Sequence, residues 1–326
     1  MTLLWGLVAC QPPAGPPPEV KLDEVAPQFI ALEGPAGTPE VEISGLAWLG
    51  ERLLLLPQYP GFAGNRPSVY ALSRASIEAA LEDGSALRPE EIPLHIGGLQ
   101  DDIRGFEGFE SIAIDGDRVW VTVEASPWPR MAAWLVPGRF DGDAIVLDDA
   151  ARVEIRAQSR RANWSDEASV WLGDELCTFY EGNAASINPH PVAHCFDADG
   201  APTAERPMAN LDFRLTDATP PDEEGRFWVV NYRYGAGSDP SPRFDALAYG
   251  YGTGPTHAES QNVERLVEME RRDGAFHLVD RAPVLLELRE DGLGRNWEGV
   301  ARLEGRGFLI VTDQHPGTLL ALVEAP

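Results

Sequence analysis

A short unit recurs five times along the chain, and this repeat constrains the fold more than any local propensity. Each copy starts with a polar residue and a short strand, turns near Gly with Asp or Glu, and ends in an almost wholly apolar strand. A continuous apolar sequence is typical of a strand that is buried on both faces, as the inner strands of a propeller blade are. The repeat predicts an all-β protein, a five-bladed β-propeller of four-stranded antiparallel blades. The copies begin at Ser44, Glu110, Glu167, Asp217 and Glu298.

Outer strands follow most of these strand pairs, but the last copy has room for only one more strand, residues 319–323, before the chain ends. We expect residues 28–32 to supply the missing strand and close the ring, because an open edge strand invites aggregation. Residues 27–326 are thus predicted to form one domain. The Gly-, Pro- and Tyr-rich insertion 233–261 in the fourth blade is either a lid over the channel or a surface excursion. Other outer strands are expected at 68–72, 92–96, 132–136, 153–156, 192–196, 263–269 and 276–279.

The N-terminus resembles the end of a bacterial lipoprotein signal peptide, in which an apolar run precedes a cysteine that becomes lipidated. Residues 3–9 form that run and Cys10 is the cysteine; an ordinary apolar N-terminus is the alternative. The run is too short to span a membrane. We expect a signal segment at 1–10, a proline-rich tether at 11–26, and a protein held in the bacterial cell envelope only by its lipid anchor.

The other two cysteines and the charge also bear on where the protein works. Cys177 and Cys195 flank a turn near Ile187 at similar distances, so they can face each other across a strand pair. In an exported protein this spacing suggests a disulfide, and two reduced buried cysteines are the alternative. The net charge of −26 argues against nucleic acid as a partner and favours cations. We expect a monomer.

The first residues of the five copies are the candidate functional site. The innermost strand of each propeller blade runs along the central channel, so equivalent positions should converge on the axis. Four carboxylates held together raise one another's pKa unless a cation is present. An oxygen-only ligand set selects calcium over zinc or copper. The predicted calcium ligands are Ser44, Glu110, Glu167, Asp217 and Glu298; solvated loop ends are the alternative reading.

A second ring follows from the hairpin spacing, which places each cross-strand partner fourteen or fifteen residues later. In the fourth copy the partner is either Asn231 or Tyr232. Polar groups at the ends of apolar strands are difficult to explain as packing, because their desolvation is costly. The second ring is predicted to contain Gln58, Glu124, Glu181, Asn231 and Asp313.

The ordered set Ser, Glu, Glu, a short polar residue and Glu resembles that of the calcium-activated apyrases. This resemblance implies a five-bladed propeller with a central calcium bound by Ser44, Glu110, Glu167 and Glu298. Asp217 stands where that family has a serine. Segments 104–113 and 296–301 are similar to the esterase-like phytase and SdiA-regulated propellers of bacteria.

Arginines precede four of the first-ring positions by three to seven residues. They could bind a small anionic ligand, or they could neutralise the acidic ring. We therefore expect a calcium-dependent hydrolase of a phosphoester or related ester, with Glu124 or Glu181 positioning water and His315 as an acid/base candidate. The alternatives are a non-catalytic binding propeller with a structural calcium and an envelope scaffold for an unknown protein. The arginines are Arg104, Arg160, Arg161, Arg214 and Arg295.

Overall fold

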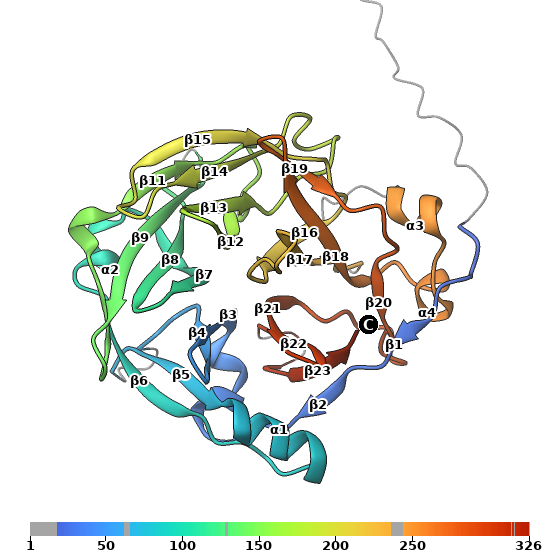
Figure 1. The fold of residues 1–326 in the computed structure, drawn as a ribbon, viewed down its shortest axis with the longest axis horizontal. Coiled ribbons are helices and arrows are strands. Elements are labelled where there is room, and N and C mark those ends of the chain that lie inside the picture. The colour runs from blue at the N-terminus through green and yellow to red at the C-terminus, as the bar shows by residue number, and fades with distance from the viewer. Residues whose placement is uncertain are drawn as a thin grey trace, which may run out of the picture.

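The computed structural model describes residues 18–61, 66–127, 130–235, 244–313, 315 and 317–325. Its strands are arranged around a central axis (Figure 1). The first strands of the five copies contact one another in a closed ring, in chain order. The nearly all-β, propeller-like architecture expected from the repeat is confirmed. These first strands are β3 (Ile43–Leu49), β7 (Phe106–Asp115), β12 (Asp166–Leu172), β16 (Arg214–Ala218) and β21 (Trp297–Leu303).

Each first strand pairs antiparallel with an apolar second strand. Alternate side chains of the second strand point to opposite faces, so each strand serves two hydrophobic cores. In β4 (Arg52–Pro57), Leu53 and Leu55 pack toward the fifth copy, whereas Leu54 and Leu56 pack toward the second. Each of the five seams between adjacent copies has such a core. The other second strands are β8 (Arg118–Ala125), β13 (Glu175–Tyr180), β17 (Arg226–Arg233) and β22 (Gly307–Thr312).

The pairing of the outer strands differs from the predicted five separate four-stranded sheets. The third and fifth copies do form four-stranded sheets, whereas the fourth copy belongs to a six-stranded one. β6 and β10 pair in parallel, with Leu94 opposite Ile145, and so join the first two copies into one nine-stranded sheet. The outer strands are β5 (Ser68–Ser73), β6 (Glu90–His95), β9 (Ala132–Phe140), β10 (Ile145–Leu147), β11 (Val153–Arg156), β14 (Val192–Phe196), β15 (Pro202–Pro207), β18 (Val263–Arg272), β19 (Ala275–Leu278), β20 (Val284–Leu286) and β23 (Leu320–Glu324).

The N-terminal segment closes the ring. β2 (Gln28–Ile30) pairs antiparallel with β23, which confirms the predicted closing strand. β1 (Glu24–Val25) pairs in parallel with β20, so the same segment also joins the sheet of the fourth copy. The chain contacts the domain from Val20, which forms a bridge with Thr253, and thus before residue 27. Cys10 and the signal segment lie outside the described residues.

Helices occupy the periphery. α1 (Arg74–Asp83) begins at Ser73, whose side chain accepts from the Ser76 N–H, and ends at Gly84 in the left-handed conformation. α3 (Ala246–Tyr251) and α4 (Pro255–Ala258) belong to the insertion and lie at the rim rather than over the axis (Figure 1). The described part of the insertion is therefore a surface excursion. In the described residues no helix could cross a membrane. The remaining helices are α2 (Leu99–Asp102) and the 3₁₀ turns Pro35–Gly37, Pro39–Val41 and Asp149–Ala151.

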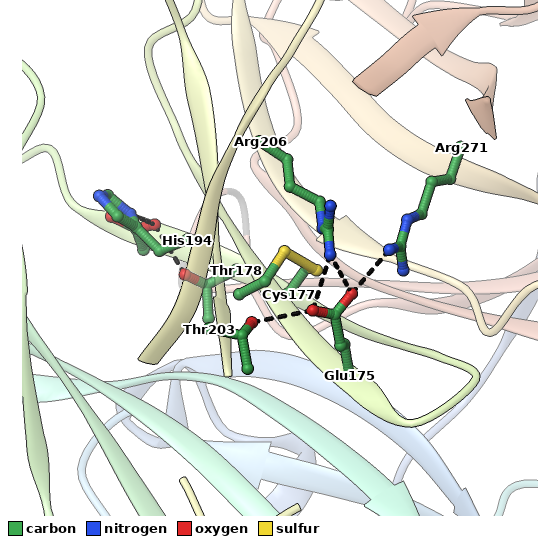
Figure 2. The surroundings of a disulfide bond; sticks show 9 residues. Glu175, Cys177, Thr178, His194, Thr203, Arg206 and Arg271 are labelled. Carbon is green, nitrogen blue, oxygen red and sulfur yellow. Dashed lines mark hydrogen bonds and ion pairs between the residues drawn. A yellow bond between two sulfur atoms is a disulfide. The ribbon is translucent and has the colours of Figure 1, made fainter. Parts of the chain in front are cut away.

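The predicted disulfide is present between Cys177 of β13 and Cys195 of β14 (Figure 2). The two residues are directly opposite each other in the strand pair, and both are buried. Nearby, Glu175 accepts hydrogen bonds from Arg206 and Thr203 and forms an ion pair with Arg271. β13 is thus bound covalently to β14 and by ion pairs to β15 and β18.

Candidate functional site

A β-bulge near the start of each first strand positions the first ring. In β3 the pairing shifts between Ile43 and Gly45, which leaves Ser44 as the extra residue. Glu110, Glu167 and Glu298 occupy the corresponding places in β7, β12 and β21. A bulged residue is released from the alternation of the strand, so its side chain can be re-aimed. The bulges explain why these polar residues share one register in the sequence.

In the fourth copy the bulge contains both Thr216 and Asp217. Ser44 Oγ donates to the Phe109 carbonyl oxygen at 2.6 Å, and Thr216 Oγ1 donates to the Trp297 carbonyl oxygen at 2.7 Å. Phe109 and Trp297 each come directly before the ring glutamate of the next copy. Thr216 is therefore the equivalent of Ser44. Thr216 follows the last regular pair, at Leu215, as Ser44 follows the pair at Ile43, so the sequence comparison placed this ring position one residue too late.

Asp217 has a different role from the one predicted. Its carboxylate accepts hydrogen bonds from the backbone N–H groups of Val300 at 2.7 Å, Ala218 at 2.8 Å and Leu46 at 3.4 Å. Burial raises the pKa of Asp217, and these three donors act against that rise. The side chain joins β16 to β3 and β21 and does not face the ring glutamates, so it is not a calcium ligand in this arrangement.

We expect Asp217→Asn to lower the free energy of unfolding by about 1–2 kcal/mol, because the amide nitrogen would face backbone donors. Calcium affinity should stay within about twofold of wild type. Thr216→Val should instead weaken calcium binding. Urea unfolding and calorimetric titration of both variants test this assignment, and an Asp217→Asn protein that loses calcium binding would contradict it.

The ring glutamates form an electrostatic cluster with the second-ring acids. Burial is the largest cause of raised pKa values in Glu110, Glu167 and Glu298, and neighbouring carboxylates add to it. Glu124 has a pKa raised to about 8, by burial and then by Glu181 and Glu107. Glu298 is partly exposed, so the cluster reaches solvent at this residue.

Arg214 is the cation within this cluster. Its Nε lies 2.9 Å from Glu181 Oε1, and its Nη1 donates to the Tyr232 hydroxyl at 3.2 Å. The charge of Arg214 partly opposes the rise in the pKa values of Glu124 and Glu298 that burial causes. Among the described residues, this one guanidinium opposes several carboxylates, so the cluster stays acidic.

The second ring is offset from the predicted pairs. Glu124 is paired with Gly108 rather than with Glu110. The backbone N–H of Glu181 donates a hydrogen bond to the carbonyl oxygen of Ser165, so Glu181 is not the partner of Glu167. The bulge shifts the register at this point, which the simple count of residues cannot include.

Two residues at second-ring positions instead donate hydrogen bonds to the ring glutamate of the next copy. Gln58 Nε2 donates to Glu110 Oε1 at 2.9 Å, and the Tyr232 hydroxyl donates to Glu298 Oε1 at 2.7 Å. Asp313 raises the pKa of Glu298. Asn231 is turned away and accepts from Arg265 Nε at 2.7 Å, so Tyr232 is the member of the cluster from the fourth copy.

The other predicted arginines and His315 lie at different depths. Arg295 is buried, and its Nε donates to Glu264 Oε2 at 2.7 Å. This ion pair joins the fourth copy to the fifth. His315 is exposed, and its backbone N–H donates to Asp313 Oδ1 at 2.8 Å, which places it at the edge of the cluster. Three predicted anion-binding arginines are exposed: Arg104, Arg160 and Arg161.

Two acidic groups of this region were not among the predicted site residues. Glu107 is half-buried and raises the pKa of Glu124. Its position within the motif 104–113 is the sequence feature that could have identified it. Asp166 is fully buried next to Glu167 and contacts His194 Nδ1 at 3.1 Å and Thr178 Oγ1 at 2.8 Å. Figure 2 shows His194 and Thr178 beside the disulfide.

The donor chemistry of the cluster suits a hard cation. Glu124 Oε1 and Glu167 Oε2 are buried oxygens with no hydrogen-bond partner among the described residues. Carboxylate, hydroxyl and carbonyl oxygens are the ligands of calcium, which accepts about six to eight of them, waters included. Within the described ranges, no three His, Cys, Asp or Glu side chains are grouped closely enough to hold a metal ion as they stand. The side chains would therefore move toward a bound ion or share it with water.

The opposite end of the central channel is apolar. Side chains from all five first-strand regions line a cavity of about 70 Å³ there, with Trp48 and Trp171 among them. This cavity has room for only two or three waters at about 30 Å³ each. This end of the channel therefore has no room for a larger ligand.

Comparisons with known proteins support the fold and leave the activity open. No protein-family model and no curated protein matches the chain. Among solved structures, an alpha-L-arabinanase of Cellvibrio cellulosa matches with a TM-score of 0.50 at 10% identity, over 86% of this chain and 90% of that one.

Two sugar dehydrogenases also match. The soluble aldose sugar dehydrogenase of Escherichia coli has a TM-score of 0.47 at 11% identity, over 92% of this chain and 100% of that one. A glucose dehydrogenase has a TM-score of 0.46 at 14% identity, over 88% and 98%. The match to the arabinanase, at 10% identity, indicates a likeness of fold alone.

Proposed function

We propose that this protein is a five-bladed β-propeller that binds calcium on its axis and hydrolyses a phosphoester or related ester beside it. The blade count rests on the five first strands and the five hydrophobic seams. The observation that carries the proposal is the set of ring glutamates that raise one another's pKa around Arg214. A cation would allow these groups to ionise together.

The ligands in this proposal are Glu110, Glu167 and Glu298, with the hydroxyls of Ser44 and Thr216 between them. Both hydroxyls use their proton in hydrogen bonds to carbonyl oxygens, so their lone pairs remain for a cation. With Thr216 at the fourth position, the order is Ser, Glu, Glu, Thr, Glu. This order resembles that of the calcium-activated apyrases more closely than the order with Asp217 at the fourth position. Thr216 supplies the hydroxyl that the family has at the fourth position.

Glu124 is the proposed general acid/base. Burial and neighbouring carboxylates raise its pKa to about 8 in the metal-free protein, and a calcium ion nearby would lower it toward neutrality, where a group can both take up and return a proton. In hydrolysis, Glu124 would accept a proton from the attacking water and then return it to the leaving alkoxide. Arg214, whose Nη1 donates to the Tyr232 hydroxyl at 3.2 Å, would stabilise negative charge on the substrate. Bound calcium would polarise the ester or phosphoryl oxygen.

A purely structural calcium is the second candidate. Glu110 and Glu167 are only 8% and 7% exposed, so an ion held by them would have little surface for a substrate. In that case the ion would join the five first strands, and the protein would be a binding or scaffold propeller.

We also propose that the protein is exported and lipid-anchored through Cys10. The disulfide supports this proposal, because such bonds persist in oxidising compartments outside the cytosol. The apolar run before Cys10 and the prolines after it are the sequence support.

Hydrolysis of a panel of phosphoesters and carboxylic esters, measured with calcium and with chelator, tests the proposal. We expect calcium-dependent turnover that falls by about 100-fold or more in Glu124→Gln, since general acid/base catalysis contributes about that much. Calcium binding, measured by calorimetry, should persist in this variant. Glu82→Gln, on the exposed side of α1, is the matched control and should behave like wild type.

Calcium binding without turnover of any panel member would favour the structural calcium. Absence of calcium binding would contradict both candidates.

A further inference from the structure

A second candidate site lies in the fourth copy, away from the axis. A cavity of about 220 Å³ is bounded by residues 245–261 of the insertion on one side and by the segments around β16, β17 and β18 on the other. Its walls include Phe213, Arg233, Asp245, His257 and Arg265. None of the predicted calcium or second-ring residues lines it. The cavity is therefore independent of the acidic cluster.

Arg265 is the centre of this cavity's chemistry. Its side chain is only 1% exposed. Nε donates to Asn231 Oδ1 at 2.7 Å, and Nη1 donates to both oxygens of Asp245 at 2.8 and 2.9 Å. Nη2 is buried and has no hydrogen-bond partner among the described residues. A buried donor without a partner is costly, so this group indicates a missing acceptor.

Arg233 places a second guanidinium at the same wall. Its Cζ lies 5.7 Å from the centre of the Phe213 ring, and the Cζ of Arg265 lies 5.3 Å from the same centre. The Nε of Arg233 is also buried without a hydrogen-bond partner in the described part of the chain. Phe213 has a φ of 71°, a left-handed backbone that a bulky residue rarely adopts. The strained residue holds its ring against both arginines.

The remaining ionisable groups leave the cavity with a positive balance. Asp245 neutralises one of the two guanidiniums. His257 uses both ring nitrogens within the fold: Nδ1 contacts Glu24 at 2.8 Å, and Nε2 accepts from the Glu264 N–H at 3.2 Å. Among the described residues of the wall, one guanidinium therefore lacks a carboxylate partner, and a further carboxylate, that of Asp212, lies outside the wall and interacts with Arg265 and Asp245.

We propose that this cavity binds a small oxyanion, whose carboxylate or phosphate oxygens accept hydrogen bonds from Arg265 Nη2 and from Arg233. Guanidinium groups recognise such planar or tetrahedral anions through paired donors. The volume is below the range of about 300–1,000 Å³ that drug-sized ligands occupy. The ligand is thus a small molecule or a terminal group of one, and Ser260 and Gln261 at the wall can contact its polar substituents.

Calorimetric titration of the full chain with inorganic phosphate and, separately, with acetate tests the proposal. Chelator is present throughout, so the outcome does not depend on calcium at the axis, and sodium chloride holds the ionic strength constant. We expect saturable binding of at least one anion, and the stronger of the two identifies the preferred class. Arg233→Gln should weaken binding about tenfold or more, because it removes one charged donor set.

Arg139→Gln is the control, since Arg139 is an exposed arginine on β9 whose nearest carboxylate is 4.0 Å away. It should bind the anion as wild type does. Arg265→Lys keeps the charge but not the paired donors and should also weaken binding; thermal unfolding checks that this variant is folded. Absence of saturable binding of both anions, or equal binding by wild type and Arg233→Gln, would overturn the proposal.

Discussion

The metal-free protein is expected to lose stability as the pH rises from about 5 to 8, and calcium is expected to restore it. Glu110, Glu167 and Glu298 have folded-state pKa values well above the ordinary value of 4.5, and Glu124 has one of about 8. Between the unfolded and folded pKa values, the native state binds more protons than the unfolded chain. Stability is then fully present below about pH 4.5 and falls as the pH passes through the folded pKa values.

The size of the effect follows from the linkage between pKa and stability. Each pKa unit corresponds to about 1.4 kcal/mol. The four carboxylates titrate as a coupled group, so we expect a loss on the order of 3 kcal/mol across this pH range rather than a sum of separate values. At pH 8, calcium at about 100 times its dissociation constant should add about 2.7 kcal/mol. Urea unfolding at pH 5 and pH 8, with chelator or with calcium, measures both quantities.

Variants separate the ring from general charge effects. Glu110→Gln and Glu298→Gln should each flatten the pH dependence in chelator, because each removes a group that repels its neighbours. Both should also lose most of the calcium increment. Glu82→Gln should retain the slope and the increment. A wild-type protein whose stability in chelator is the same at pH 5 and pH 8 would show that the glutamates are not coupled as described.

The repeat and the seams could be predicted from the sequence because alternation along a strand is a local property. Leu53 to Leu56 are all apolar, which indicates a strand buried on both faces, and each pair of alternate residues enters a different core. The closing strand 28–32 was predictable for a similar reason, since the fifth copy lacked one partner. The disulfide followed from the symmetry of Cys177 and Cys195 about their turn.

The position of single side chains was less predictable wherever a bulge changes the register. In β16 the ring position is Thr216 rather than Asp217, and Asn231, which is paired with Leu215, accepts a hydrogen bond from Arg265 instead of joining the cluster. Long-range contacts were also beyond the sequence. The parallel pairing of β6 with β10 and the three backbone bonds of Asp217 join segments from different copies, and no local pattern specifies them.

Loss of the Cys177–Cys195 disulfide is expected to lower the free energy of unfolding by about 3 kcal/mol. The bond closes a loop between residues 18 positions apart, and constraint of the unfolded chain by a loop of that length contributes about this much. Because both cysteines are buried, the native protein should react slowly with reductant, and the loss should appear after reduction in urea followed by refolding. Urea unfolding of the oxidised and reduced forms measures the difference.

The double variant Cys177→Ala/Cys195→Ala distinguishes the cross-link from the reductant itself. Its stability should be close to that of the reduced wild type, apart from the smaller cost of truncating two buried side chains. Reductant should not change it further, since Cys10 is the only cysteine that remains. β13 connects the disulfide to the acidic ring through Glu181, which follows its last residue. The double variant should therefore also bind calcium more weakly, whereas equal stability with and without the cross-link would show that hydrogen bonds and the Glu175 ion pairs hold this copy together unaided.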